Sequence, residues 1–474
     1  MRSSVNGMRS SLNLKIIGAI AAAIAGIAIV NIPARAQVAL QFKDSSSPEF
    51  ADLAPDKSKS QGNLPAAGDV LIAGGLGSNL KSTTASEFFV PAQKKFLATG
   101  AMTAARLFAA STIIGHSFFL AGGALETFNW NNGAKDLTIT FGPLANAESY
   151  SEATGKFSAA ASAMSVTRMG ATATLFSGGT LAGKVLIVGG IDKFGDVLTS
   201  AEIYDPISGN FTPTTGSLHN ARYAHDATLL ANNDVLITGG LRDNQGNVLD
   251  SAEVFNPSTG TFTAVGSMHD QRFGHTTTVL PDNTVLVVGG FSALEGNTVT
   301  SAEVYNPIAQ TFTAVGSMTQ MRGFQTATLL GNGKVLIAGG FSADEVTIDP
   351  PSSDGLRLAG IFGFTAKSAE LYDPNTQTFS CIGGPGKQFA NYVGFPTCAS
   401  TMKDAHAAHT ATLLPSGSPL AGDVLIAGGF SSVKPHKFPP PTKAAEIYNP
   451  ATNKFTAVGA MKTARAFAAS ALLQ

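Results

Sequence analysis

Residues 235–262 read VLITGGLRDNQGNVLDSAEVFNPSTGTF, and this stretch holds the markers of the repeat that decides the fold. An apolar run ends in the doublet Gly239-Gly240, Glu253 stands two residues before an aromatic residue, Asn256-Pro257 follows, and Phe262 lies nine residues after the glutamate. The apolar run predicts a strand buried on both faces. Glycine permits positive φ and the close approach of another backbone, and Asn-Pro starts a tight turn. We therefore expect a buried strand followed by a rigid hairpin.

The same markers occur seven times in one order, and three consecutive spacings between central doublets are 50 residues each. The second glycines of the doublets are Gly75, Gly123, Gly190, Gly240, Gly290, Gly340 and Gly429. The glutamates are Glu87, Glu148, Glu202, Glu253, Glu303, Glu370 and Glu446. Each is followed nine residues later by Phe96, Phe157, Phe211, Phe262, Phe312, Phe379 or Phe455. Seven copies of three markers establish an internal repeat from about residue 65 onward.

A further strand is expected after an arginine in each unit, as in the stretches that follow Arg222 (YAHDATLL), Arg272 (FGHTTTVL) and Arg322 (GFQTATLL). Each unit then has four short antiparallel strands and a period near 50, which is typical of a β-propeller blade. Because the glutamate and the arginine recur, with His406 replacing the arginine once, we interpret them as structural and not catalytic. We expect each glutamate to accept hydrogen bonds from backbone groups or from the arginine, and so to fix neighbouring sheets. The structural repeat residues in the central units are Gly189, Gly190, Glu202, Arg222, Gly239, Gly240, Glu253, Arg272, Gly289, Gly290, Glu303 and Arg322.

These motifs resemble the kelch repeat, and the resemblance covers about 410 residues, with the period near 50 of that family. One departure is that the usual Trp of the last strand is Phe in all seven copies, which resembles a bacterial exported subtype. The resemblance implies an all-β fold, a seven-bladed kelch-type β-propeller with four antiparallel strands per blade.

The two ends of the repeat region complete one another. The repeats begin at a second strand, 69–75, and finish with a first strand, 465–474. We predict that Phe467–Leu473 pairs with Val70–Gly75, so that 466–473 closes the first blade, which otherwise comprises 69–96. A closed ring removes exposed sheet edges. The propeller then spans 67–474, and 37–66 is expected to be a linker or a strap over the surface.

The first 36 residues are expected to be a signal peptide. Arg2, Arg9 and Lys15 precede an apolar run of 15 residues, and Ala34-Arg35-Ala36 matches a cleavage site. The alternative is an uncleaved anchor, but a spanning helix needs about 20 apolar residues. Cleavage would change the formal net charge from −1 to −5, which disfavours nucleic acid as a partner. We therefore expect an exported monomer, secreted or periplasmic, with no membrane insertion after cleavage.

Three long insertions interrupt the repeats, and antiparallel geometry places all of them on one face. They fall in loops between strands 2 and 3 or between strands 4 and 1, and they contain aromatic residues. Exposed aromatics on loops over a rigid scaffold are common in binding sites; the alternative is that they pack back on the blades. The candidate binding-face aromatics are Phe128, Trp130, Phe362, Phe364, Phe389, Tyr392 and Phe395.

Cys381 and Cys398 both lie in the third insertion, and in an exported protein this favours a disulfide. Four histidines of adjacent units offer an alternative metal site, but their repetition favours packing, so we expect no metal and no cofactor. These histidines are His219, His225, His269 and His275. We assign no catalytic residue.

Three functions remain open. The leading one is a non-enzymatic scaffold that binds a protein or a glycan through the face with the long loops. The second is a carbohydrate-active enzyme, because the resemblance extends to a sialic-acid mutarotase and, less closely, to galactose oxidase, a copper enzyme with a Cys–Tyr cross-link. The third is a purely structural envelope or matrix protein. Fold alone does not decide between them.

Overall fold

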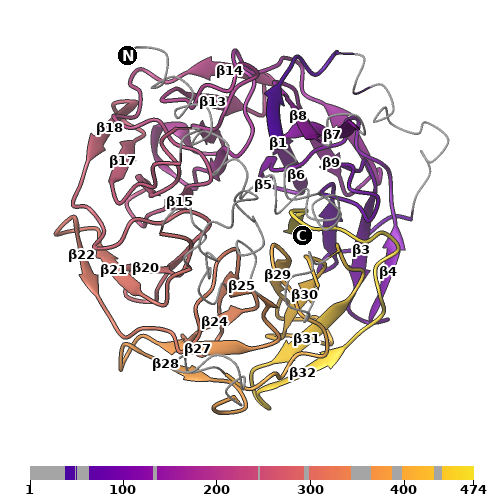
Figure 1. Ribbon diagram of the computed structural model, residues 1–474, viewed down its shortest axis with the longest axis vertical. Coiled ribbons are helices and arrows are strands. Elements are labelled where there is room, and N and C mark those ends of the chain that lie inside the picture. The colour runs from indigo at the N-terminus through magenta and orange to yellow at the C-terminus, as the bar shows by residue number, and fades with distance from the viewer. Residues whose placement is uncertain are drawn as a thin grey trace, which may run out of the picture.

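The computed structural model describes residues 38–47, 50, 63–131, 136–243, 246–292, 298–342, 364–386, 398–431 and 440–474. The regular secondary structure of the described chain is almost all strand, with one short 3-10 helix, η3 (Gly179–Leu181). It contains seven four-stranded antiparallel sheets, which Figure 1 shows arranged around a common centre. The expected all-β class is therefore confirmed.

Each sheet is named here by its innermost strand, and the strands below run outward from the centre. The sheets are β33 (Ala469–Leu472), β2 (Val70–Ala73), β3 (Ser86–Val90), β4 (Lys95–Ala98); β5 (Ala110–Ile114), β6 (Ser117–Ala121), β9 (Ala147–Ser151), β10 (Lys156–Ala159); β11 (Thr172–Leu175), β12 (Val185–Val188), β13 (Ala201–Asp205), β14 (Asn210–Pro213); β15 (Asp226–Leu229), β16 (Val235–Thr238), β17 (Ala252–Asn256), β18 (Thr261–Ala264); β19 (Thr276–Val279), β20 (Val285–Val288), β21 (Ala302–Asn306), β22 (Thr311–Ala314); β23 (Thr326–Leu329), β24 (Val335–Ala338), β27 (Ala369–Asp373), β28 (Thr378–Cys381); and β29 (Thr410–Leu413), β30 (Val424–Ala427), β31 (Ala445–Asn449), β32 (Lys454–Ala457).

The second strand of each sheet is buried along its whole length, as in VLIT of β16 and VLVV of β20, except that Ser117 at the start of β6 is half-buried. Its two faces pack against different neighbours: Leu236 of β16 joins a cluster with Val285 and Val287 of the next sheet, whereas Val235 and Ile237 pack toward the preceding one. This is the arrangement that the uninterrupted apolar runs predicted. The fourth strands are mostly exposed, because no other described strand pairs with them on the outer rim.

The Gly-Gly doublets join neighbouring sheets. In all seven, the second glycine N–H donates to the carbonyl of the arginine, or of His406, that begins the next sheet, at 2.7–2.9 Å. The first glycine leaves room for that carbonyl: a Cβ on Gly289 would lie 2.7 Å from the Arg322 oxygen. Gly289 and Gly290 have φ of 67° and 98°, a region that favours glycine. The expected close approach of a second backbone is confirmed.

The C-terminal strand pairs with the first strand of the repeat region. β33 is antiparallel to β2, with Val70 opposite Leu472 and Ala73 opposite Ala469, and Leu76 forms a further bridge to Ala466. This is the pairing that the sequence predicted.

A further three-stranded sheet has the order β1 (Val38–Phe42), β8 (Asp136–Pro143), β7 (Ala124–Asn131). β1 runs parallel to β8, so 38–42 is a regular strand where we expected a linker or a strap without secondary structure. β7 and β8 form the hairpin of the first insertion, between β6 and β9. The second insertion contains the short pair β25 (Phe341–Ser342) and β26 (Phe364–Thr365).

A hydrophobic cluster from every sheet fills the centre of the molecule. Each sheet contributes a two-residue bridge between the position after its arginine and the position after its doublet, such as Phe273 with Phe291. These residues belong to one buried cluster, against which Phe42 of β1 packs and to which Ile139 and Phe141 of β8 belong. The β1-β8-β7 sheet therefore packs onto the central cluster from the side of the loops between second and third strands.

Candidate functional site

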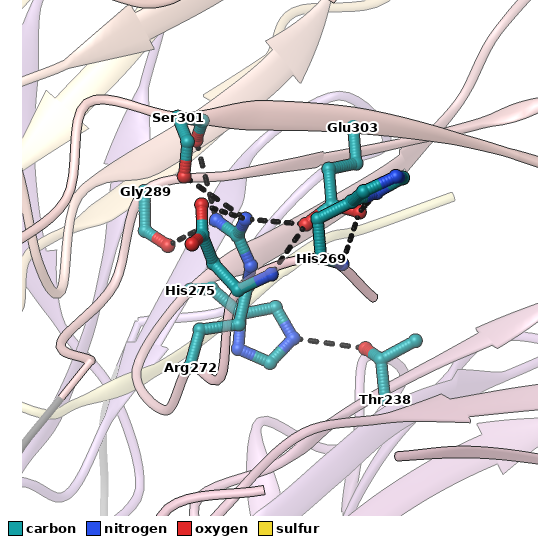
Figure 2. A network of polar contacts seen from close by, with 8 residues as sticks. Thr238, His269, Arg272, His275, Gly289, Ser301 and Glu303 are labelled. Atoms are coloured by element: carbon teal, nitrogen blue, oxygen red, sulfur yellow. Dashed lines mark hydrogen bonds and ion pairs between the residues drawn. The ribbon is translucent and has the colours of Figure 1, made fainter. Parts of the chain in front are cut away.

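The charged repeat residues form an internal clamp, shown for the β19 sheet in Figure 2. The Arg272 guanidinium donates to Glu303 Oε1 at 2.8 Å, to the Gly289 carbonyl at 2.9 Å and to Ser301 Oγ at 3.1 Å. Glu303 also accepts the backbone N–H of His269 at 2.8 Å. The two charged side chains are 0% and 1% exposed. The clamp thus ties the incoming loop, the doublet and the third strand together.

The clamp lies within one sheet, so the expectation that it fixes neighbouring sheets is wrong; the doublets do that. Arg272 begins β19 and Glu303 lies in β21 of the same sheet. In the β29 sheet His406 takes the place of the arginine, with Nδ1 2.7 Å from the Gly428 carbonyl and Nε2 3.4 Å from Glu446. The arginine–glutamate pairs are Arg106–Glu148, Arg168–Glu202, Arg222–Glu253, Arg272–Glu303, Arg322–Glu370 and Arg465–Glu87.

The four histidines considered as an alternative metal site make two separate sets of contacts. His219 and His269 are more than half exposed and bond Glu253 and Glu303 through Nδ1 at 2.9 and 2.8 Å. His225 and His275 are buried and bond threonine hydroxyls through Nε2 at 3.0 and 2.8 Å. Among the described residues the one cluster with metal-ligand spacing is Glu370, Cys381 and Cys398.

The centre of the ring is built from seven residues in the left-handed region, each two positions after a repeat arginine or His406. Their φ values run from 51° to 68°. Six backbone hydrogen bonds of 2.9–3.2 Å link them one to the next, from Gly170 N–H to the Phe108 carbonyl and onward to Phe467 N–H on the Ala408 carbonyl. We call them the axial ring: Phe108, Gly170, Ala224, Gly274, Phe324, Ala408 and Phe467.

Beside the axial ring lies a cavity of about 340 Å³, the axial cavity, lined by the ring, by the residue that follows each ring member, and by Met169, Tyr223 and Asp226. One side is polar, because four consecutive sheets place His225, His275, Gln325 and His409 three positions after the arginine or His406. The other three sheets have alanine there, at 109, 171 and 468. The cavity therefore arises where the repeats differ.

Electrostatics of the axial cavity are set by burial. Burial lowers the pKa of His225 to about 3, with the Arg222 charge as a second cause, and lowers the pKa of His275 and His409 well below the usual value. These imidazoles are therefore neutral near pH 7. Burial raises the pKa of Asp226, against hydrogen bonds from Thr277 and from the Ala227 N–H.

The repeat units match a known family. The model of the kelch motif matches residues 173–215, 227–269 and 272–319, which contain most of the β11, β15 and β19 sheets. This chain is a kelch-repeat protein. No curated protein sequence matches it.

Two solved structures are similar to this kelch-repeat chain at low sequence identity. The structure of YjhT matches with a TM-score of 0.48 and 13% identity, over 75% of this chain and 98% of YjhT. A fungal alcohol oxidase of the AA5 family, in complex with copper, matches with a TM-score of 0.53 and 14% identity, over 79% of this chain and 70% of the oxidase. The likeness to the oxidase shows the fold alone.

The side chains of the aromatics predicted for the binding face lie outside the described part of the chain, so their role stays a prediction. Phe128 and Trp130 lie in β7, and Phe364 lies in β26, but their side chains are outside the described part. Phe362, Phe389, Tyr392 and Phe395 lie outside the described residues altogether.

The kelch repeats expose another aromatic that sequence reasoning missed. Phe194, in the loop between β12 and β13, is 76% exposed. Its neighbour Lys193 forms an ion pair of 2.9 Å with Asp44, just after β1, so the loop and the β1-β8-β7 sheet adjoin on one face. The signal was present in the sequence, since aromatic Phe194 stands at a loop tip beside Gly195.

The two cysteines of the third insertion form the predicted disulfide, Cys381–Cys398, with a Cα–Cα distance of 5.3 Å. Cys381 ends β28 and Cys398 pairs with Pro385, so the bond closes the base of the insertion between β28 and β29. Both sulfurs of the metal-like cluster are therefore engaged, and its Glu370 holds Arg322.

Proposed function

We propose that this protein is an exported, non-enzymatic kelch propeller that binds a protein or a glycan through the face carrying the loops between strands 2 and 3 and between strands 4 and 1, called the loop face below. The observation that carries the proposal is the contrast between the repeated charges and the loop face. The six arginine–glutamate pairs are buried and bonded to each other within the clamps, whereas Phe194 is exposed on the loop face. The repeat supplies a scaffold, and its departures supply contacts.

We infer a ring of seven blades closed by β33. Contacts between innermost strands support it, because they run from β5 through β11, β15, β19, β23, β29 and β33 back to β5. The doublet bonds support it as well, since Gly75 reaches Arg106 and Gly429 reaches Arg465. Closure makes the loop face rigid, which lowers the entropic cost of binding.

Export is part of the proposal, with cleavage after Ala36 and release as a monomer. The Cys381–Cys398 disulfide is compatible with an oxidising compartment. Within the described ranges, no helix has the length and apolarity needed to cross a membrane.

The test is a glycan array, with a crosslinking screen for protein partners, run on the purified protein and on loop-face variants. We expect Phe194→Ala or Trp130→Ala to weaken binding at least tenfold. Ile207→Ala is the matched control, because Ile207 is 98% exposed in the turn between β13 and β14, on the opposite face. A ligand whose binding is lost in Ile207→Ala and kept in both loop-face variants would overturn the proposal.

A carbohydrate-active enzyme is the second candidate, favoured by the histidines and Asp226 in the axial cavity. Anomer exchange followed by NMR, a sugar-oxidation assay and metal analysis of the purified protein test it. Copper with oxidase activity, or accelerated anomer exchange lost in Asp226→Asn, would establish the enzyme and displace the scaffold.

A further inference from the structure

Asp226 is the one acid at its position in the repeat. The equivalent residues, four positions after the arginine or His406, are threonine or alanine in the other six sheets: Ala110, Thr172, Thr276, Thr326, Thr410 and Ala469. Asp226 begins β15, lines the axial cavity and is partly buried. A residue that departs from six copies of a structural repeat, and lies in a cavity, points to a role outside the repeat.

The carboxylate of Asp226 has no cationic partner among the described residues. Oδ2 accepts the backbone N–H of Thr277 at 2.7 Å and its hydroxyl at 2.9 Å, and Oδ1 accepts the Ala227 N–H at 2.9 Å. The nearest repeat arginine, Arg222, is committed to Glu253 at 2.8 Å. The carboxylate is thus held in place by neutral donors, and its charge is not balanced by them.

No described residue that lines the axial cavity is Lys or Arg. The three histidines of the lining are neutral near pH 7, as their lowered pKa values require. Gln325 is bound through Nε2 to the Val288 carbonyl, and its Oε1 has no partner within the described part of the chain. The cavity therefore presents a carboxylate and further acceptors, without a cationic side chain among its lining residues.

The axial ring adds an aromatic and apolar surface to the lining of the cavity. Phe467 lies 4.5 Å from Phe108 and 5.3 Å from Phe324, measured between ring centroids. Ala109 and Ala171 leave space beside these rings, where the polar sheets have histidine or glutamine. Aromatic faces together with a carboxylate are the groups that recognise organic ammonium ions.

We propose that the axial cavity binds a small organic cation, an amine or a quaternary ammonium compound, with Asp226 as its counter-ion and Phe108, Phe324 and Phe467 as its apolar wall. A volume of about 340 Å³ accommodates a ligand of metabolite size. A sugar acid is disfavoured, because its carboxylate would meet Asp226 with no cation to neutralise either. The lining of the cavity does not include Phe194 or the other aromatics named for the loop face, so the inference does not depend on the function proposed above.

Isothermal titration of the full chain at pH 7.5 tests the proposal with three probes: choline, its neutral isostere 3,3-dimethylbutan-1-ol, and N-acetylneuraminate. We expect choline to bind at least tenfold more tightly than the isostere, and N-acetylneuraminate to show no saturable binding. Spermidine is the second cationic probe. Equal affinity for choline and its isostere, preference for N-acetylneuraminate, or no binding of either cation would overturn the proposal.

Two variants locate the site. Asp226→Thr introduces the residue found at this position in four other sheets, so this variant should fold. It should weaken choline binding at least tenfold. Asp226→Asn tests for the same loss of affinity with a nearly isosteric side chain. Asp234→Asn, in the turn after β15, is the matched control and should leave binding unchanged. Unaltered choline affinity in both Asp226 variants would place the cation elsewhere and refute the assignment.

Discussion

Arg465 donates a hydrogen bond of 2.8 Å to Glu87, a residue 378 positions earlier in the chain. Both side chains are 1% exposed, and Arg465 also bonds the carbonyls of Gly74 and Ala85. The sheet that contains the start of the repeat region is therefore completed from its end, by the same clamp that the other sheets form from contiguous sequence.

Deletion of 465–474 should destabilise the protein far more than the loss of ten residues from a surface would. The deletion removes β33, leaves Glu87 buried without its arginine, and exposes the edge of β2. We expect the melting temperature in calorimetry to fall by more than 10 °C. Deletion of 1–36 is the control and should leave it within about 2 °C; a truncated C-terminus that melts as the intact protein does would contradict closure by β33.

Removing one clamp arginine should cost about 3 kcal/mol, because a buried glutamate is left unpaired. Arg272→Ala is the test, measured by urea unfolding. Arg272→His should recover part of the loss, since His406 occupies the equivalent position in the β29 sheet. Lys184→Ala, which removes the half-exposed ion pair of 3.1 Å with Asp205, is the control and should cost less than about 1 kcal/mol. Equal losses in Arg272→Ala and Lys184→Ala would exclude a structural clamp.

The fold was predictable because its sequence markers recur seven times. The doublets, the glutamates and the arginines mark strand ends, and a marker that reappears at the same spacing identifies the unit even when one copy departs, as His406 does. The partners of the clamp were predictable too. It was not predictable whether the two partners belong to one sheet or to neighbouring sheets. The strand order within a blade does not tell whether Arg272 reaches Glu303 or a glutamate of the next blade.

The candidate site was harder to predict, because it lies where the repeats differ. The axial ring alternates among Phe, Gly and Ala, so no motif marks it, and only its place two residues after each arginine is constant. The departure of Asp226 from the threonine and alanine of the other sheets is visible in the sequence, but the sequence alone does not place this residue in a cavity. The β1 strand had a signal as well, since Val38, Leu40 and Phe42 alternate with small or polar residues.

Stability should fall as the pH falls below 6.5, in part through His225. The folded state keeps His225 neutral to about pH 3, whereas the unfolded chain protonates it near 6.5, so the unfolded state binds more protons between these values. The loss amounts to roughly 1.4 kcal/mol per pH unit for one such histidine. Below about pH 4.5 the clamp glutamates act in the same direction. Burial alone would raise the pKa of Glu253, but the hydrogen bonds from His219 and Arg222 and the Arg222 charge lower it by more, so the net shift of the pKa is downward. Stability that depends on the ionised Glu253 is therefore lost as the pH falls through its lowered pKa.

His225→Gln isolates the histidine contribution, because glutamine occupies the equivalent position at Gln325. The melting temperature of this variant between pH 6.5 and 5 should decline less steeply than that of the wild type. His219→Gln is the control, because His219 is more than half exposed. Parallel profiles for His225→Gln and the wild type would show that burial does not hold His225 neutral.

Two glycines of the axial ring should respond differently to the same substitution. Gly170 and Gly274 have φ of 68° and 59°, so a change to alanine costs about 1–2 kcal/mol at either position through backbone strain. At Gly274 the new Cβ would also lie 2.9 Å from the Phe324 ring, whereas at Gly170 its nearest neighbour would be the Ala224 nitrogen at 3.6 Å. Gly274→Ala should therefore lower stability to urea by at least about 1 kcal/mol more than Gly170→Ala, because Phe324 is packed against Phe273, Phe291 and Phe467 and has little room to move. The double variant Gly274→Ala/Phe324→Ala removes the ring that would contact the new Cβ. In a double-mutant cycle, the additional loss of stability in Gly274→Ala relative to Gly170→Ala should then disappear. An excess that persists without the Phe324 ring would mean that the backbone, and not the aromatic wall of the cavity, requires glycine at 274.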